Sequence, residues 1–91
     1  MQLDQNFVAS DDVVSREVAG EMVLLDLASG QYFGLSGVGG RVWARLTESA
    51  CSIRDLSQLI EAEFDAPYER IEQDVLALAR DLAERNLIRP A

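Results

Sequence analysis

Residues 31–43 read QYFGLSGVGGRVW, and within them a strand pattern is followed directly by a helix pattern. Gln31–Leu35 is short, uncharged and rich in aromatic and branched residues, as strands are. Beyond the glycine cluster Gly37-Val38-Gly39-Gly40, Val42 and Leu46 follow Val38 at steps of four residues, which is the spacing of a helix face. The chain therefore changes from strands to helices at these glycines.

Working back from residue 31, the pattern predicts an antiparallel meander. Ala19-Gly20 and Ser29-Gly30 are turn sequences that separate runs rich in Val and Leu. Phe7 and Val8 indicate a short additional pairing segment. The predicted strands of the meander are Val13–Val18, Met22–Leu27 and Gln31–Leu35.

Working forward, the pattern predicts three helices. Ser36 is the expected N-cap of the first, which carries Trp43 as a core residue. Ser52 and Asp55 form a capping-box sequence for the second. Pro67 suits the first turn of the third helix, and Asn86 can cap its end. The predicted class is α+β, a three-stranded antiparallel sheet followed by three helices in a winged helix-turn-helix-like order, forming one domain over residues 1–91.

Composition excludes many enzyme classes. All eight basic residues are Arg, so the chain has no Lys and no His, and Cys51 is its single cysteine. Catalytic triads and imidazole relays need His, while Walker loops and Schiff bases need Lys. One cysteine forms neither an internal disulfide nor a cysteine-based zinc site. Cys51 is expected to be a small structural residue, and no metal or cofactor is expected.

Charge and hydropathy narrow the partners. A net charge of −8 opposes binding to nucleic acid and to anionic membranes. No apolar run reaches the roughly 18–20 residues that span a bilayer, and the first residues do not form a signal peptide. We expect a cytoplasmic protein.

The third predicted helix has a wide apolar face. With an advance of about 100° per residue, its core stripe covers an arc of roughly 60°. The core stripe consists of Ile71, Val75, Leu78 and Leu82. Tyr68, Leu76, Ala79 and Ala83 extend the apolar arc to roughly 160°. This second face either lines a shallow groove or covers another part of the core.

The third predicted strand is the second unusual feature. If the strands pair in chain order, Gln31–Leu35 is an edge with unpaired backbone groups and no charge to protect it. Either another segment of the chain covers this edge, or a peptide adds to it as a further strand.

Several motifs together resemble the PqqD-like family of peptide-recognition domains, also called RiPP recognition elements. They are Val23-Leu24-Leu25-Asp26-Leu27, Gly30-Gln31-Tyr32-Phe33-Gly34-Leu35, Gly40-Arg41-Val42-Trp43, Asp74-Val75, Leu82 and Leu87-Ile88, with Leu56 in the second helix. The series covers residues 13–88. Within the family, the chain looks most like the stand-alone leader-binding B1 proteins of lasso-peptide biosynthesis. Ser36 departs from the Asn of many relatives, and the Gly39-Gly40 pair is a second departure.

The resemblance implies a function without catalysis. The leader of a ribosomally made precursor peptide would add as a strand to the third strand and lie against the third helix. A cysteine-type leader peptidase (B2-like) would then remove the leader, and an ATP-dependent cyclase would close the ring. The binding residues implied are Gln31, Tyr32, Phe33, Gly34 and Leu35 on the strand, and Asp74, Leu76, Leu78, Ala79 and Ala83 on the helix.

Three other readings remain open at this stage. Another PqqD-type protein would present its precursor to a different modifying enzyme, such as a radical enzyme in quinone cofactor synthesis. A winged-helix DNA-binding protein shares the order of elements, but its recognition helix should be basic. A structural subunit would use the open edge for self-association.

Overall fold

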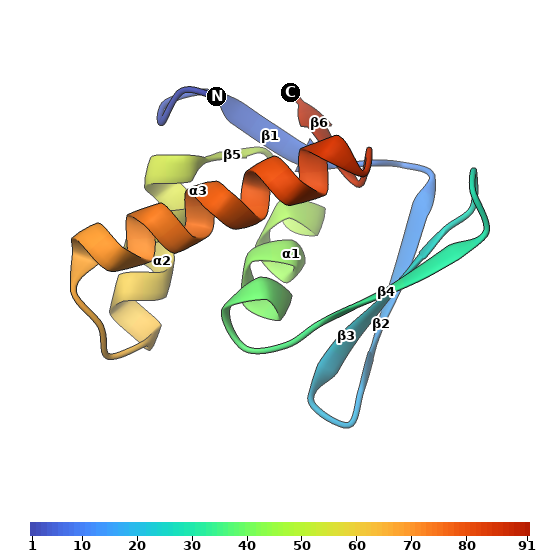
Figure 1. Ribbon diagram of the computed structural model, residues 1–91, viewed down its shortest axis with the longest axis horizontal. Coiled ribbons are helices and arrows are strands. Elements are labelled where there is room, and N and C mark those ends of the chain that lie inside the picture. Colours follow the sequence, from blue (N-terminus) through green and yellow to red (C-terminus); the bar gives the residue numbers. More distant parts are fainter.

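The computed structural model describes all residues, 1–91, and contains two small sheets and three helices. The elements are β1 (Asn6–Ala9), β2 (Val13–Val18), β3 (Glu21–Asp26), β4 (Gln31–Leu35), α1 (Val38–Glu48), β5 (Cys51–Ser52), α2 (Ile53–Glu63), α3 (Tyr68–Glu84) and β6 (Ile88–Pro90). The helices and the sheet of β1, β5 and β6 form one part of the molecule, and the β2–β3–β4 meander projects from it (Figure 1).

The predicted meander is confirmed, with β3 beginning and ending one residue earlier than expected. Leu27 lies just outside the strand, although its N–H still donates to the carbonyl oxygen of Asp12, at 2.9 Å, beyond the last pair Val13 and Asp26. Leu24 of β3 is fully buried, and Phe33 and Leu35 of β4 pack against the same core. The meander is thus attached to the helices by alternate side chains of one face.

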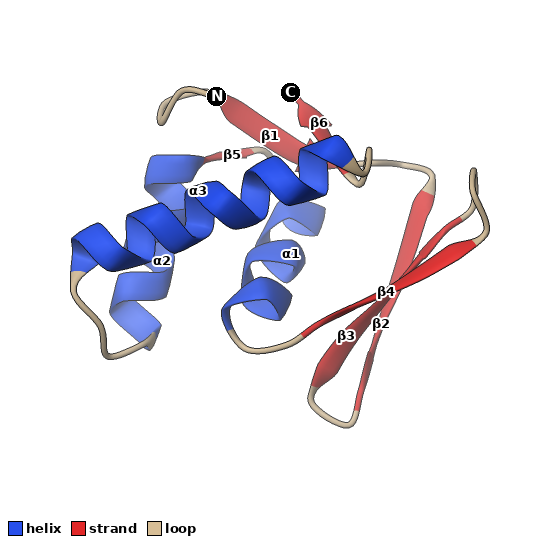
Figure 2. Cartoon of the chain, in the orientation of Figure 1, coloured by secondary structure: helices blue, strands red, loops and turns tan.

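A second sheet, which the sequence pattern did not predict, closes the other side of the core. β1 pairs with β5 through Phe7 and Cys51 and with β6 through Val8 and Arg89, both antiparallel. Figure 2 shows this sheet next to the helices and separate from the meander. The predicted pairing segment at Phe7 and Val8 exists, and its partners are two very short strands far away in the chain.

The three predicted helices are confirmed, with one correction at a cap. The N-cap of α1 is Gly37, in a left-handed conformation (φ 55°), and no side chain caps the helix, so the prediction for Ser36 is wrong. The turn from β4 into α1 is so tight that a Cβ on Gly40 would lie 3.4 Å from the carbonyl oxygen of Leu35. The close approach of the Gly40 and Leu35 backbones therefore determines how α1 begins, and the Ser36 side chain remains exposed.

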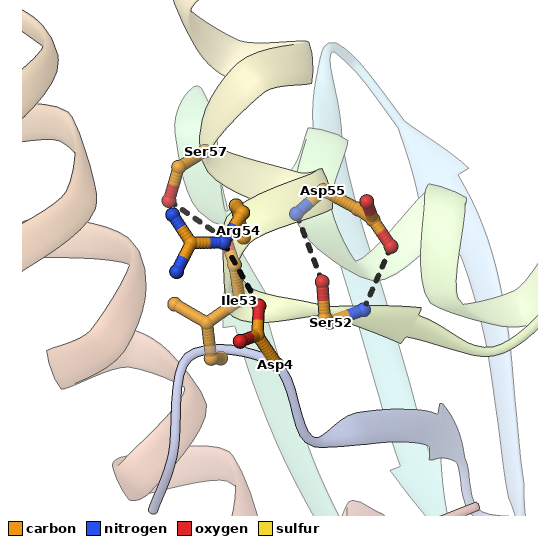
Figure 3. A network of polar contacts seen from close by, with 6 residues as sticks. All are labelled: Asp4, Ser52, Ile53, Arg54, Asp55 and Ser57. Atoms are coloured by element: carbon orange, nitrogen blue, oxygen red, sulfur yellow. Dashed lines mark hydrogen bonds and ion pairs between the residues drawn. The ribbon is translucent and has the colours of Figure 1, made fainter.

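The ends of α2 and α3 follow the sequence signals. Ser52 Oγ accepts from the Asp55 N–H at 3.0 Å, and the Asp55 carboxylate accepts from the Ser52 N–H at 3.2 Å (Figure 3). Pro67 is the N-cap of α3, directly before its first turn. Asn86 follows α3 with φ 60°, and the N–H of Leu87 reaches back to Leu82, as in a Schellman motif.

The core lies between the helices and both sheets. Trp43 is fully buried, as predicted, and its indole N–H has no hydrogen-bond acceptor in the protein. Arg41 and Glu63 form an ion pair at 2.9 Å that joins α1 to the end of α2, and the hydrogen bond to Glu63 raises the pKa of Arg41. No helix of the structure is both long and apolar enough to cross a membrane.

Candidate functional site

β4 is an edge strand with one unpaired side. The sheet order is β2-β3-β4, so β4 pairs only with β3. In an antiparallel ladder, alternate residues of such a strand direct their N–H and C=O groups away from the sheet. Exposed edges of this kind accept a further strand. The edge predicted from the sequence is therefore present and available.

The register of β4 assigns its side chains to two faces. Phe33 lies opposite Leu24, and Leu35 lies opposite Met22, so both point toward the helices. Tyr32 lies on the other face and is 71% exposed. Gly34 shares that face, and a Cβ there would meet no atom within 4 Å. Gln31, at the start of the strand, is exposed.

One flank of α3 comes close to the helix-facing side of β4. A Cβ placed on Gly39 would lie 3.5 Å from the side chain of Leu35 and 3.9 Å from that of Leu78, so these two residues converge there. Two turns further along α3, the Arg85 guanidinium lies 5.3 Å from the centre of the Phe33 ring. Asp81 forms an ion pair with Arg85 at 3.2 Å. We give the name β4–α3 surface to Phe33, Leu35, Leu78, Asp81 and Arg85.

A hollow of about 310 Å³ lies beside Val38 at the start of α1, shortly after the end of β4. Its walls come from α1, from the end of α2 and from the first turns of α3, and most of them are apolar. Asp65, Arg70 and Asp74 supply charge at its rim. The lining residues are Val38, Ile60, Phe64, Asp65, Ala66, Arg70, Ile71 and Asp74. The hollow can hold an apolar side chain, with a carboxylate for a neighbouring cation.

The structure brings some of the predicted helix residues to β4 and not others. Asp74 and Leu78 lie on the flank of α3 that also carries Asp81 and Arg85, since these positions repeat every seven residues, or two helix turns. Ala79 is 1% exposed and belongs to the core, so it is not accessible to a peptide.

Leu76 and Ala83 lie on the opposite flank of α3. Each is about 160° around the helix from the β4-facing residues Leu78 and Arg85 respectively. Tyr68 shares the flank of Leu76. Burial, together with Glu72, raises the pKa of the Tyr68 phenol, and Arg54 of α2 offsets only part of this rise. Leu76 and Ala83 are partly buried against the core. Leu76 and Ala83 therefore do not lie beside the β4 edge. The apolar arc read from the sequence gives the width of the helix face, but it does not show which element each side of that face contacts.

The sequence reasoning missed Asp81, Arg85 and the hollow. The signal for the first two was present, since Arg85 follows Asp81 by four residues and both continue the flank of Asp74 and Leu78. The hollow had no such signal, because it forms where three helices meet.

Cys51 is buried, and the acidic residues do not gather into a metal site. Cys51 is 3% exposed in β5, and burial raises the pKa of its thiol, which keeps it protonated and unreactive. No three His, Cys, Asp or Glu side chains lie close enough together to hold a metal ion. The described arrangement offers backbone pairing, apolar contact and charge, which are the means of peptide binding.

Comparison with protein families gives a match over most of the chain. The family model described as coenzyme PQQ synthesis protein D (PqqD) matches residues 21–88. The chain belongs to the PqqD family. In this PqqD-family chain the match spans β3 to the start of β6, and so includes β4 and α3.

Two solved structures are similar to this PqqD-family chain. The first is TbiB1 in complex with the TbiA(beta) leader peptide, at 36% identity and a TM-score of 0.83, covering 90% of this chain and 94% of that one. The second is a lasso peptide synthetase B1 complexed with the leader peptide, at 27% identity and a TM-score of 0.80, covering 92% and 98%. A search of curated proteins found no match.

Proposed function

We propose that this protein, acting as one domain over residues 1–91, binds the leader of a precursor peptide in lasso-peptide maturation and presents it to a leader peptidase. The observation that carries the proposal is the free edge of β4 beside α3, in a chain similar over nine-tenths of its length to a protein solved with a leader peptide. The protein itself catalyses nothing and needs no cofactor. It acts in the cytoplasm, where a cysteine-type peptidase and then an ATP-dependent cyclase process the peptide.

The leader adds to β4 as an antiparallel or parallel fourth strand. Backbone hydrogen bonds to Gln31–Leu35 set its register, and every second side chain of the leader points to the β4–α3 surface. Phe33, Leu35 and Leu78 supply apolar contact there, while Asp74 and Asp81 attract basic residues. An apolar leader residue beyond the paired segment occupies the hollow.

A matched pair of substitutions on α3 tests this proposal. Leu76 and Leu78 are both half-buried leucines on one helix, but they lie on opposite flanks. Binding of a synthetic leader peptide, taken from the small reading frame beside the gene, is measured by calorimetry. Leu78→Glu should weaken binding more than about tenfold, because a carboxylate then lies where apolar side chains meet. Leu76→Glu should change the Kd less than about twofold.

Circular dichroism melts show whether each variant is folded, and Leu78→Ala replaces Leu78→Glu if the latter unfolds. Strand addition also predicts how the peptide backbone contributes to binding. Only alternate N–H groups of an added strand face β4, so N-methylation of the leader should weaken binding at alternate positions only. Equal effects of the two glutamate variants, or no saturable binding to the wild type at tens of micromolar, would refute the proposal. Competition by duplex DNA would point instead to a DNA-binding protein.

A further inference from the structure

One cation lies within the β4–α3 surface, and two contacts hold it in place. The Arg85 guanidinium is 5.3 Å from the centre of the Phe33 ring, which is a cation–π distance. Its Nε donates to the Asp81 carboxylate at 3.2 Å, one helix turn earlier. These contacts join the end of α3 to the middle of β4, so the guanidinium has a defined position before any peptide binds.

Most of the hydrogen-bonding capacity of Arg85 is unused. A guanidinium has five N–H donors, and in Arg85 only the donor on Nε has an acceptor in the protein. The amino groups Nη1 and Nη2 have no partner, and half of the side chain is exposed. Two such groups match the two oxygens of a carboxylate, which a guanidinium binds through parallel hydrogen bonds. Arg85 can therefore bind a second carboxylate while it keeps its bond to Asp81.

A leader bound to β4 would cover these amino groups. Residues directly opposite each other on paired strands have Cβ atoms about 5 Å apart, so the leader residue paired with Phe33 lies beside the Phe33 ring. The Arg85 guanidinium contacts the same ring, on the side of the sheet that faces α3. The leader displaces water from Nη1 and Nη2, and a charged donor left without an acceptor weakens binding.

An acidic side chain supplies the missing acceptor. A basic residue at this leader position would place a second positive charge beside the guanidinium, and an apolar residue would leave Nη1 and Nη2 unpaired. The bond from Arg85 to Asp81 is 3.2 Å long, whereas strong bonds between a guanidinium and a carboxylate measure about 2.7–2.9 Å. Asp81 therefore orients Arg85 without satisfying it.

Resting on the proposed function, we infer that Arg85 is a specificity-determining residue that binds an acidic side chain of the leader at the position paired with Phe33. Two residues away on the same face, the leader position paired with Leu35 lies beside Leu78 and is apolar. A leader that is basic overall is compatible with this contact, since the field of the protein acts on its total charge and Arg85 acts on one residue.

A double-mutant cycle with the synthetic leader peptide tests the inference. Arg85→Glu reverses the charge on the protein, and each Asp or Glu of the leader is replaced in turn by Lys. Arg80→Glu is the matched control, since Arg80 is an exposed residue of the same helix and belongs to none of the ion pairs. Calorimetry measures every combination, and circular dichroism melts show whether each protein is folded.

Arg85→Glu should weaken binding of the unchanged leader about tenfold or more, and one acidic leader position should lose as much when it is changed to Lys. The two changes together should restore the Kd to within about threefold of wild type, because the opposite charges then meet in reversed order. At every other acidic leader position the two losses should add. Arg80→Glu should change the Kd less than about twofold.

If Arg85→Glu unfolds, the cycle uses Arg85→Gln with Asn or Gln at the acidic leader positions, and two losses that do not add would then identify the pair. The inference is wrong if no leader change couples to the change at Arg85, or if Arg85→Gln binds the leader as tightly as wild type. Either result would leave leader binding itself intact. A wild type that binds no leader would overturn the proposed function, and the inference with it.

Discussion

At the scale of single residues, Asp26 shows how a buried carboxylate positions the β4 edge. Asp26 ends β3 and is only 8% exposed. Its carboxylate accepts from the Ala28 N–H at 3.1 Å and from the Ser29 hydroxyl at 2.8 Å, and its carbonyl accepts from the Gly30 N–H at 2.7 Å. These bonds hold the turn directly before β4, so a residue outside the proposed contacts determines where the edge begins.

Asp26→Ala should therefore lower both stability and leader affinity. Loss of two hydrogen bonds to a charged acceptor costs about 3 kcal/mol. For a domain of this length, Tm should fall by roughly 12–24 °C in a circular dichroism melt. Ser29→Ala removes one of the two bonds and should cause a smaller fall. A Tm within about 2 °C of wild type for Asp26→Ala would show that the turn does not depend on this carboxylate.

At the scale of elements, the N-terminus of α2 is stabilised by a capping box, whereas no side chain caps the N-terminus of α1. Figure 3 shows the reciprocal bonds of Ser52 and Asp55, and also Ser57, whose hydroxyl donates to the Ile53 carbonyl at 2.8 Å. The same view shows Arg54 paired at 2.8 Å with Asp4, which holds the N-terminal segment to this end of α2. The start of α2 thus joins three segments of the chain.

Ser52→Ala should lower the free energy of unfolding by about 1 kcal/mol, because the N–H of Asp55 loses its acceptor. Ser36→Ala is the matched control, since Ser36 precedes α1 without capping it, and its effect should stay within about 0.5 kcal/mol. Urea unfolding followed by Trp43 fluorescence measures both variants. Equal losses for the two variants would contradict the assignment of the caps.

The elements also show what a sequence can predict. β2, β3 and β4 were predictable because each has β-forming residues bounded by a turn, and α2 because its capping box precedes a helical period. β5 and β6 were not, since strands of two or three residues contain no period and form only when β1 meets segments far along the chain. Leu76 was misplaced for a related reason: the flank that meets β4 depends on how α3 packs, which no local pattern records.

At the scale of the whole molecule, acidic charge surrounds the candidate site. Asp65, Asp74 and Asp81 lie along the path from the hollow to the end of the β4–α3 surface. Arg85 is paired with Asp81 and stacked on Phe33, so it offsets only part of this charge. Together with the net charge of −8, the surroundings of β4 attract a basic peptide and repel an acidic one.

Binding of a basic leader should consequently depend on salt mainly through its association rate. Between about 20 mM and 500 mM NaCl the Debye length falls severalfold, so long-range attraction is screened while contacts within the complex persist. Stopped-flow measurements should show the association rate constant falling about tenfold and the dissociation rate constant changing less than about threefold.

A charge variant beside the site separates this local field from the overall charge. Asp74→Asn should make the association rate less sensitive to salt than in wild type, because Asp74 lies at the rim of the hollow. Glu48→Gln removes one negative charge at the last residue of α1, about 15 Å along the helix from Val38 of the hollow, and should change the sensitivity less. If both variants reduce the salt sensitivity of the association rate equally, the net charge of the protein alone accounts for the attraction of the peptide. If salt does not slow association in wild type, the acidic surroundings of β4 play no part in capture, and the leader is held by backbone pairing and apolar contact alone.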